Sequence, residues 1–92
     1  MIVSYRHKGL ELYATKGDRS KLHQPYIQKI KTILTRLEAA TNPQMMDQPG
    51  YKFHSLSGDL QGFYSVKVSG NYRIIFRFEG DNAYDVDYLD YH

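Results

Sequence analysis

The stretch Phe63-Tyr-Ser-Val-Lys-Val68, Ser69-Gly-Asn71, Tyr72-Arg-Ile-Ile-Phe-Arg-Phe78 decides the fold of this chain. In both outer runs, side chains alternate between two faces with the period of a β-strand. The Gly and Asn between them accept the positive φ that a tight turn requires. The stretch therefore predicts a β-hairpin with one apolar face. The opposite face would carry Lys67, Arg73 and Arg77, with Ile75 among them.

Three other segments have the composition of strands in the same sheet. Residues 51–56 alternate before a Gly-rich loop, and residues 83–89 place Tyr84, Val86 and Tyr88 on one side. The short β-prone run at residues 2–5 suits one edge of the sheet. We therefore expect an antiparallel meander of four to five strands.

The N-terminal half has the pattern of two helices. Leu10, Leu12 and Tyr13 predict a short helix that ends at Gly17, a typical C-cap residue. Pro25 suits the first turn of a longer helix, because its missing N–H is harmless there. Apolar residues then recur at spacings of three and four from Tyr26 to about Ala40. Two helices followed by a meander predict a single α+β domain over residues 1–92, with the helices packed on the sheet.

Length and composition exclude several classes of protein. The 92 residues suffice for one core, and no cysteine is available for a disulfide or a thiolate metal site. No apolar run is long enough to cross a membrane, and the N-terminus has no signal-peptide pattern. The four histidines are scattered along the chain, so we expect no metal and no cofactor. We expect a soluble, cytoplasmic protein with no membrane partner.

Charge is unevenly distributed, although the net charge is only +2. Residues 1–40 hold eight Lys and Arg against three acids, whereas residues 79–92 hold five acids and no Lys or Arg. Such asymmetry suits a basic surface that binds a polyanion. The alternative is a solvated helix face and an acidic edge strand without a binding role.

Five residues have the side chains needed to cleave RNA without a metal: His54, Arg73, Asp90, Tyr91 and His92. One imidazole or carboxylate could take the 2′-hydroxyl proton while another group protonates the leaving 5′-oxygen. An arginine could stabilise the charge on the phosphorane. The alternatives are an exposed strand histidine, a frayed terminus, and an arginine paired across the sheet with Asp85 or Asp87.

Several motifs resemble the HigB toxins of the RelE superfamily along the whole chain. They include His54-Ser-Leu-Ser-Gly58, Gly70-Asn-Tyr-Arg-Ile74 and the terminal Asp90-Tyr-His92, which is the most specific of them. The resemblance implies a RelE-like, microbial-ribonuclease-type fold with two helices on a curved antiparallel sheet. It also implies a toxin of a type II toxin–antitoxin system that cleaves mRNA in the decoding site of the ribosome. A HigA antitoxin with a helix-turn-helix would neutralise it, and operator DNA would be bound only through that complex.

The resemblance also assigns roles to residues. His54, Asp90, Tyr91 and His92 match the proposed catalytic group of the family, and Arg73 matches its phosphate-stabilising arginine. We expect the message to contact Lys52, Ser57 and Asn71. Basic residues of the helical half would bind the small ribosomal subunit through phosphates: Lys8, Lys16, Arg19, Lys21, Lys29 and Lys31.

One position departs from the family pattern. Many relatives read His-Pro-Leu-Lys-Gly where this chain has His54-Ser55-Leu56-Ser57-Gly58, so Ser57 replaces a lysine expected to face the RNA backbone. The change bears on cleavage rate or RNA affinity rather than on the fold. It leaves open a second hypothesis, a non-catalytic binder that blocks translation by occupying the decoding site. A DNA-binding module is disfavoured because no recognition-helix motif is evident.

Overall fold

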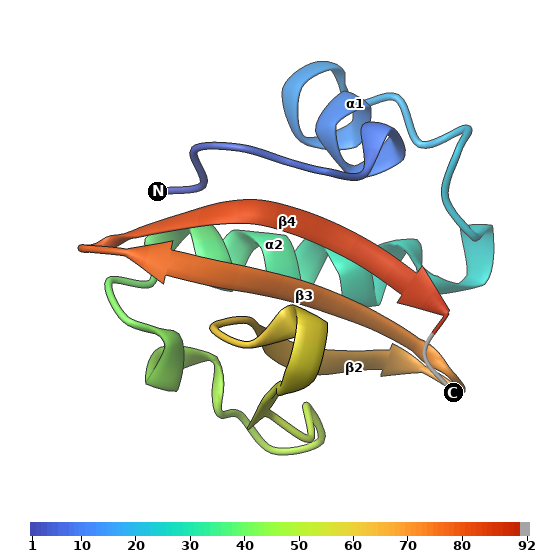
Figure 1. Ribbon diagram of the computed structural model, residues 1–92. Coiled ribbons are helices and arrows are strands. Elements are labelled where there is room, and N and C mark those ends of the chain that lie inside the picture. The colour runs from blue at the N-terminus through green and yellow to red at the C-terminus, as the bar shows by residue number, and fades with distance from the viewer. Residues whose placement is uncertain (91–92) are drawn as a thin grey trace.

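The computed structural model describes residues 1–90. Helices α1 (Lys8–Lys16) and α2 (Ile27–Ala39) precede four strands: β1 (His54–Ser55), β2 (Tyr64–Ser69), β3 (Tyr72–Glu79) and β4 (Asn82–Asp90). The strands form one antiparallel sheet in the order β1-β2-β3-β4. Figure 1 shows α2 along one face of this sheet and α1 beyond its β4 edge. The predicted α+β architecture is thus confirmed.

Local sequence accounts for the ends of both helices. The His7 ring accepts a hydrogen bond from the Leu10 N–H and so caps α1 at its start. Gly17 ends the same helix in a left-handed conformation, with φ +70°. A short 3₁₀ turn (Gln24–Tyr26) containing Pro25 leads into α2. The two predicted helices therefore begin and end close to where the sequence places them.

The main core lies between α2 and the sheet. Side chains of α2 at spacings of three and four are buried, and they face β-strand side chains that alternate along β2 and β3. These strands contribute Val66, Val68, Ile74 and Phe76. A second, smaller cluster lies on the opposite face of the sheet, where Leu56 and Phe63 cover Ile75. Ile75 is therefore covered, although Arg73 and Arg77, two positions away on the same face, are basic.

Two predicted strands are wrong in extent. Only His54–Ser55 of residues 51–56 is a strand, because the Pro49-Gly50 turn and the positive φ of Lys52 (48°) interrupt the extended chain. Residues 2–5 lie beside β4, as predicted for an edge. They make only two isolated parallel bridges, Ile2 to Ala83 and Tyr5 to Val86.

The predicted face of Tyr84 is also wrong. The register between β3 and β4 shifts between Ile75 and Arg77, so that Ala83 and Val86 both enter the core. Asp85 lies at the shift with φ +55°, a β-bulge that inserts one extra residue. Tyr84 consequently faces the other side, where the Arg77 guanidinium carbon lies 5.1 Å from the centre of the Tyr84 ring.

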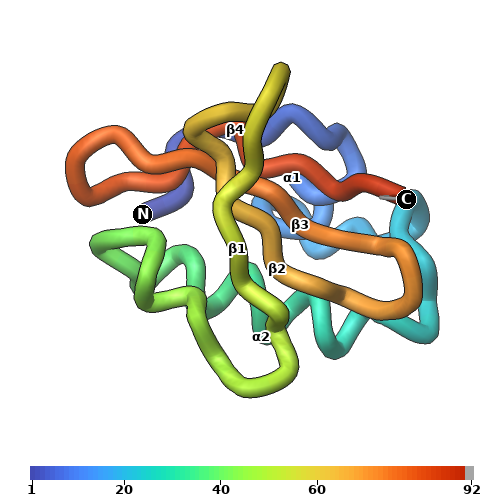
Figure 2. The backbone as a smooth tube through the Cα atoms, turned by 60° about the horizontal axis from the view of Figure 1, so that its bottom comes forward, coloured from blue at the N-terminus to red at the C-terminus, as the bar shows by residue number. Residues whose placement is uncertain are grey.

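Within the described part of the chain, three short 3₁₀ turns lie outside the main elements, one before α2 and two flanking β1. The turns near β1 are η2 (Pro43–Met46) and η3 (Gly58–Leu60). Figure 2 shows the loop that contains η3 projecting from the molecule next to β1. Within residues 1–90, no helix has the length and apolar character that crossing a bilayer requires.

Candidate RNA-cleaving site

The register of the sheet arranges polar residues in two rows on the face opposite α2. One row crosses all four strands as His54, Ser65, Ile75 and Asp87. The next row crosses β2, β3 and β4 as Lys67, Arg73 and Leu89. Directly paired residues of neighbouring strands point to the same face, about 5 Å apart. The two rows therefore place His54 and Arg73 on one surface, as the sequence predicted.

Ser65 links these two rows. It is fully buried, and its hydroxyl accepts a hydrogen bond from Nη1 of Arg73 at 3.2 Å. Because Ser65 also pairs with His54 in the register, the strand that positions the arginine also positions the histidine. The sequence analysis did not select Ser65. The sequence did contain an indication of its position, because Ser65 alternates with Tyr64 and Val66 and so belongs to the face of β2 opposite the apolar side chains.

The His54 ring is exposed, and its Nδ1 lies 3.0 Å from the carbonyl oxygen of Lys52. A carbonyl oxygen only accepts, so Nδ1 carries the proton in this contact. In the neutral ring, Nε2 then holds the lone pair. This tautomer is the one that a general base needs if Nε2 faces the substrate.

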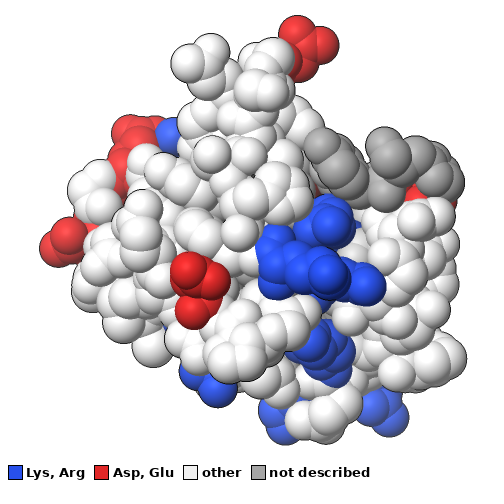
Figure 3. Space-filling view, turned by 90° about the horizontal axis from the view of Figure 1, so that it is seen from below, with Lys and Arg blue, Asp and Glu red and all other residues white. Residues whose placement is uncertain are grey.

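A basic strip continues from Arg73 toward the edge of the sheet. Lys67 lies directly opposite Arg73, and its N–H donates to the carbonyl of Tyr51 at 2.7 Å, which brings Lys52 alongside. Lys52 is exposed, and Lys67 and Arg73 are half-buried. Figure 3 shows Lys and Arg side chains gathered on the side of the molecule where β1 lies. Lys67 was not among the predicted site residues, although the hairpin register would have placed it beside Arg73.

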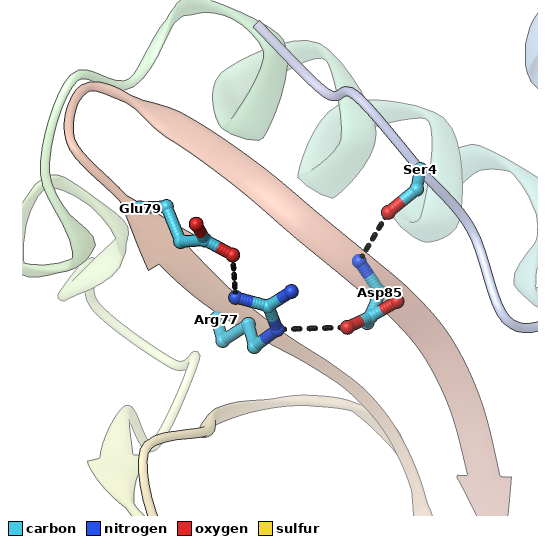
Figure 4. A network of polar contacts seen from close by, with 4 residues as sticks. All are labelled: Ser4, Arg77, Glu79 and Asp85. Atoms are coloured by element: carbon cyan, nitrogen blue, oxygen red, sulfur yellow. Dashed lines mark hydrogen bonds and ion pairs between the residues drawn. The ribbon is translucent and has the colours of Figure 1, made fainter.

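Arg77 lies on the same face but has a different role. It forms ion pairs with Glu79 and with Asp85, whose Oδ2 lies 2.7 Å from the arginine Nε (Figure 4). These contacts raise the pKa of the Arg77 guanidinium, the hydrogen bond to Glu79 contributing most and that to Asp85 next. Ser4 supports the arrangement by accepting a hydrogen bond from the Asp85 N–H. Asp85, a predicted alternative partner for Arg73, is thus the partner of Arg77.

The other predicted message-binding and catalytic residues do not all lie on this face. Ser57 is exposed at the start of η3, and Asn71 is exposed in the β2–β3 turn. Asp90 ends β4 opposite Tyr72, one position beyond the Arg73–Leu89 pair, so by strand alternation it belongs to the face of Tyr72 and not to that of Arg73. Tyr91 and His92 lie outside the described residues.

The six predicted ribosome-binding residues do not lie together on one surface. Lys8 pairs with Glu11 on α1, and Lys16, Arg19 and Lys21 are exposed at its end and in the following loop. On α2, Lys31 borders a groove with Tyr13 and Glu38. Lys29 lies on the other flank of that helix, with its ammonium 4.9 Å from the centre of the Tyr51 ring. No group of three or more His, Asp or Glu residues within residues 1–90 could hold a metal ion.

Comparison with known proteins identifies the family of this chain. A model of HigB toxins, described as RelE-like toxins of type II toxin–antitoxin systems, matches residues 3–92. The chain belongs to the HigB-like toxin family. It is 38% identical over its full length, and over the full length of the relative, to a Proteus vulgaris protein named Endoribonuclease HigB. It is also 29% identical to Toxin HigB-1 of Vibrio cholerae serotype O1, covering all of this chain and 98% of that one. The helices and sheet described above therefore belong to a RelE-like fold.

Proposed function

We propose that this HigB-like toxin is an endoribonuclease that cleaves mRNA in the decoding site of the ribosome and so inhibits translation. The observation that carries the proposal is the face shared by His54 and Arg73, with Ser65 bonded to the arginine and Lys67 beside it. Full-length similarity to a relative named an endoribonuclease supports it.

The proposed reaction needs only protein side chains. The 2′-oxygen attacks the adjacent phosphorus while a general base removes its proton, and the bond from phosphorus to the 5′-oxygen breaks as a general acid protonates that oxygen. The products are a 2′,3′-cyclic phosphate and a free 5′-hydroxyl. His54 and the terminal residues Asp90, Tyr91 and His92 supply the acid and base, and Arg73 stabilises charge on the phosphorane. Each acid–base role contributes roughly 10²–10⁴-fold to the rate.

Two groups of surface residues would hold the substrate. Lys52, Ser57 and Asn71 are exposed and would contact the message. The exposed cations of the helical half would bind phosphates of the small ribosomal subunit. A HigA-type antitoxin with a helix-turn-helix would complete the system, and operator DNA would be bound through that complex.

A second candidate function rests on Ser57. This exposed residue stands in the loop before η3 where the family pattern expects a lysine, so one cation is missing beside the sheet face. A toxin that binds the decoding site without cutting the message would also stop translation. The two candidates differ in whether the message is broken.

Primer extension on a defined message bound in ribosomes tests the proposal. We expect cuts with the wild type and a loss of roughly 10²–10³-fold with Arg73→Gln, as for removal of one group that stabilises a transition-state charge. His54→Ala and His92→Gln should also lose cleavage while retaining ribosome binding. Arg77→Gln is the matched control, because Arg77 lies on the same strand and face but is engaged by Glu79 and Asp85.

Two results would contradict the proposed endoribonuclease or its dependence on the ribosome, and a third would reveal a folding defect in the variants. Stalled ribosomes with an intact message would favour the translation blocker. Equal cleavage of naked RNA would remove the dependence on the ribosome. Equal losses in Arg73→Gln and Arg77→Gln would mean that the defect is one of folding, which thermal denaturation followed by circular dichroism would reveal.

A further inference from the structure

A second basic surface lies between α2 and the segment that leads from η2 to β1. There, residues of one flank of α2 face Gln48, Pro49 and Tyr51 across a groove. The α2 side contributes Lys29 and Arg36, which are seven residues apart and so lie on one face of the helix, about 10 Å apart along its axis. The groove residues include these two cations and no acid.

The groove also offers polar groups suited to a sugar–phosphate chain. Gln28, Thr32 and Gln48 line it with amide and hydroxyl groups, which bind phosphate and sugar oxygens in many nucleic-acid complexes. The Tyr51 ring supplies an apolar wall, with the Lys29 ammonium held 4.9 Å from its centre. This contact fixes the position of one cation at the groove.

The groove is joined to the candidate cleavage face through Tyr51. The carbonyl of this residue accepts the N–H of Lys67, which lies directly opposite Arg73. Lys52 follows Tyr51 in the chain and is exposed. Basic side chains thus lead from the sheet face to the groove in the order Arg73, Lys67, Lys52, Lys29, Arg36.

We propose that the groove between α2 and residues 48–51 binds the phosphodiester backbone of RNA that continues from the cleavage face. This inference rests on the proposed function only because it takes the RNA to run on from the cleavage face. The binding of phosphates by the groove does not depend on that function. Lys29 and Arg36 neutralise phosphates, and the neighbouring amides and hydroxyl donate to sugar and phosphate oxygens. The continuity with Arg73 favours RNA over an acidic peptide of the antitoxin, which would need only the groove itself.

The test measures binding rather than cleavage, using the full chain and a 2′-O-methyl RNA oligonucleotide that cannot be cut. Fluorescence anisotropy at several salt concentrations gives the affinity and its salt dependence. For single strands, each lost phosphate contact reduces the slope of log K against log [salt] by about 0.7. We expect Lys29→Gln/Arg36→Gln to reduce that slope by about 1.4 and to weaken binding roughly tenfold or more. Arg36→Gln alone should give about half of the slope change, and it leaves the Lys29–Tyr51 contact intact.

The matched control is Lys16→Gln. Lys16 is exposed at the end of α1, outside both the groove and the sheet face of His54 and Arg73, so the variant removes one positive charge elsewhere on the molecule. We expect its salt slope with the oligonucleotide to equal that of the wild type. A similar loss of oligonucleotide binding in Lys16→Gln and Arg36→Gln would show a general charge effect and would overturn the groove.

Binding to ribosomes without a message and binding to the antitoxin distinguish other occupants. If the groove holds the message, Lys29→Gln/Arg36→Gln binds the oligonucleotide more weakly than the wild type does. Unchanged oligonucleotide binding overturns the proposal. Weaker binding to ribosomes without a message would then identify ribosomal RNA as the occupant, and weaker antitoxin binding would identify an acidic protein segment. If the wild type binds RNA through the groove but does not cut the message, the endoribonuclease proposal fails and the groove proposal stands.

Discussion

Ser65 shows how a single buried hydroxyl can position a charged side chain. It has no exposed surface, and burying such a group without a hydrogen bond would be costly. Its bond to Arg73 offsets that cost and fixes one nitrogen of the guanidinium. The residue therefore acts on the proposed reaction through Arg73, as a positioning residue.

Replacing Ser65 with Ala should lower cleavage without abolishing it. The arginine keeps its charge but loses one acceptor that orients it, so we expect about a tenfold lower single-turnover rate, equivalent to ~1.4 kcal/mol. Ribosome binding should be unchanged, and Ser65→Thr should restore part of the rate because it retains the hydroxyl. Wild-type rates in Ser65→Ala would show that the bond is structural only.

His7 makes α1 sensitive to acid. Its Nδ1 accepts the Leu10 N–H, which requires an unprotonated nitrogen. Burial lowers the pKa of His7 from its ordinary value of 6.5, and the nearby Asp87 opposes this only in part. Because the unfolded chain then takes up the proton first, this contribution to stability is complete above pH 6.5 and is lost as the pH falls through the lower pKa of the folded state.

Urea denaturation of the wild type and of His7→Asn, at pH values above and below 6.5, measures this effect. Asn caps helices well and does not titrate, so the variant should keep α1 and lose this part of the acid sensitivity. Loss of a cap of this kind costs about 1 kcal/mol. Identical pH profiles for the two proteins would rule out His7 as the source, since His23 and His54 are present in both.

At the scale of elements, alternation predicted most of the sheet correctly and failed where a strand is irregular. β2 and β3 follow the pattern because their apolar side chains face α2 without interruption. β4 does not, because the bulge at Asp85 shifts its phase midway. An aspartate among alternating residues has no feature that announces a bulge, although Asp tolerates a left-handed backbone better than most residues.

The bulge predicts opposite effects of glycine at two nearby aspartates. At Asp85, φ is +55°, so Asp85→Gly should be about 1 kcal/mol more stable than Asp85→Ala, since both lose the ion pair with Arg77. At Asp87, whose φ is not positive, the order should reverse by about 0.5–1 kcal/mol. Thermal and urea denaturation of the four variants measures both differences. The same order at both positions would mean that the backbone is regular at residue 85.

At the scale of the whole molecule, sequence and resemblance predicted the layers correctly, whereas the roles of the site residues stay predictions. His54 and Arg73 share a face because their partners on β2 do. His54 pairs with Ser65 and Arg73 pairs with Lys67, and these two partners are two residues apart on the same strand. What the sequence could not predict depends on contacts between distant segments. The small cluster around Ile75, the hydrogen bond between Ser65 and Arg73, and the approach of Tyr51 to Lys67 all arise only when the sheet is assembled.

The arrangement of charge over the whole molecule leads to the last prediction. Lys67 lies beside Arg73 on the sheet face, whereas Lys16 is exposed at the end of α1, beyond the β4 edge. We expect Lys67→Gln to weaken binding of an uncut RNA oligonucleotide and to reduce its salt slope by about 0.7. Lys16→Gln should leave that binding unchanged and weaken only binding to ribosomes. Anisotropy with the oligonucleotide and sedimentation with ribosomes would measure the two effects separately. If each variant weakened both interactions equally, message and ribosome would share one diffuse basic surface, and the division between sheet and helices would have to be abandoned.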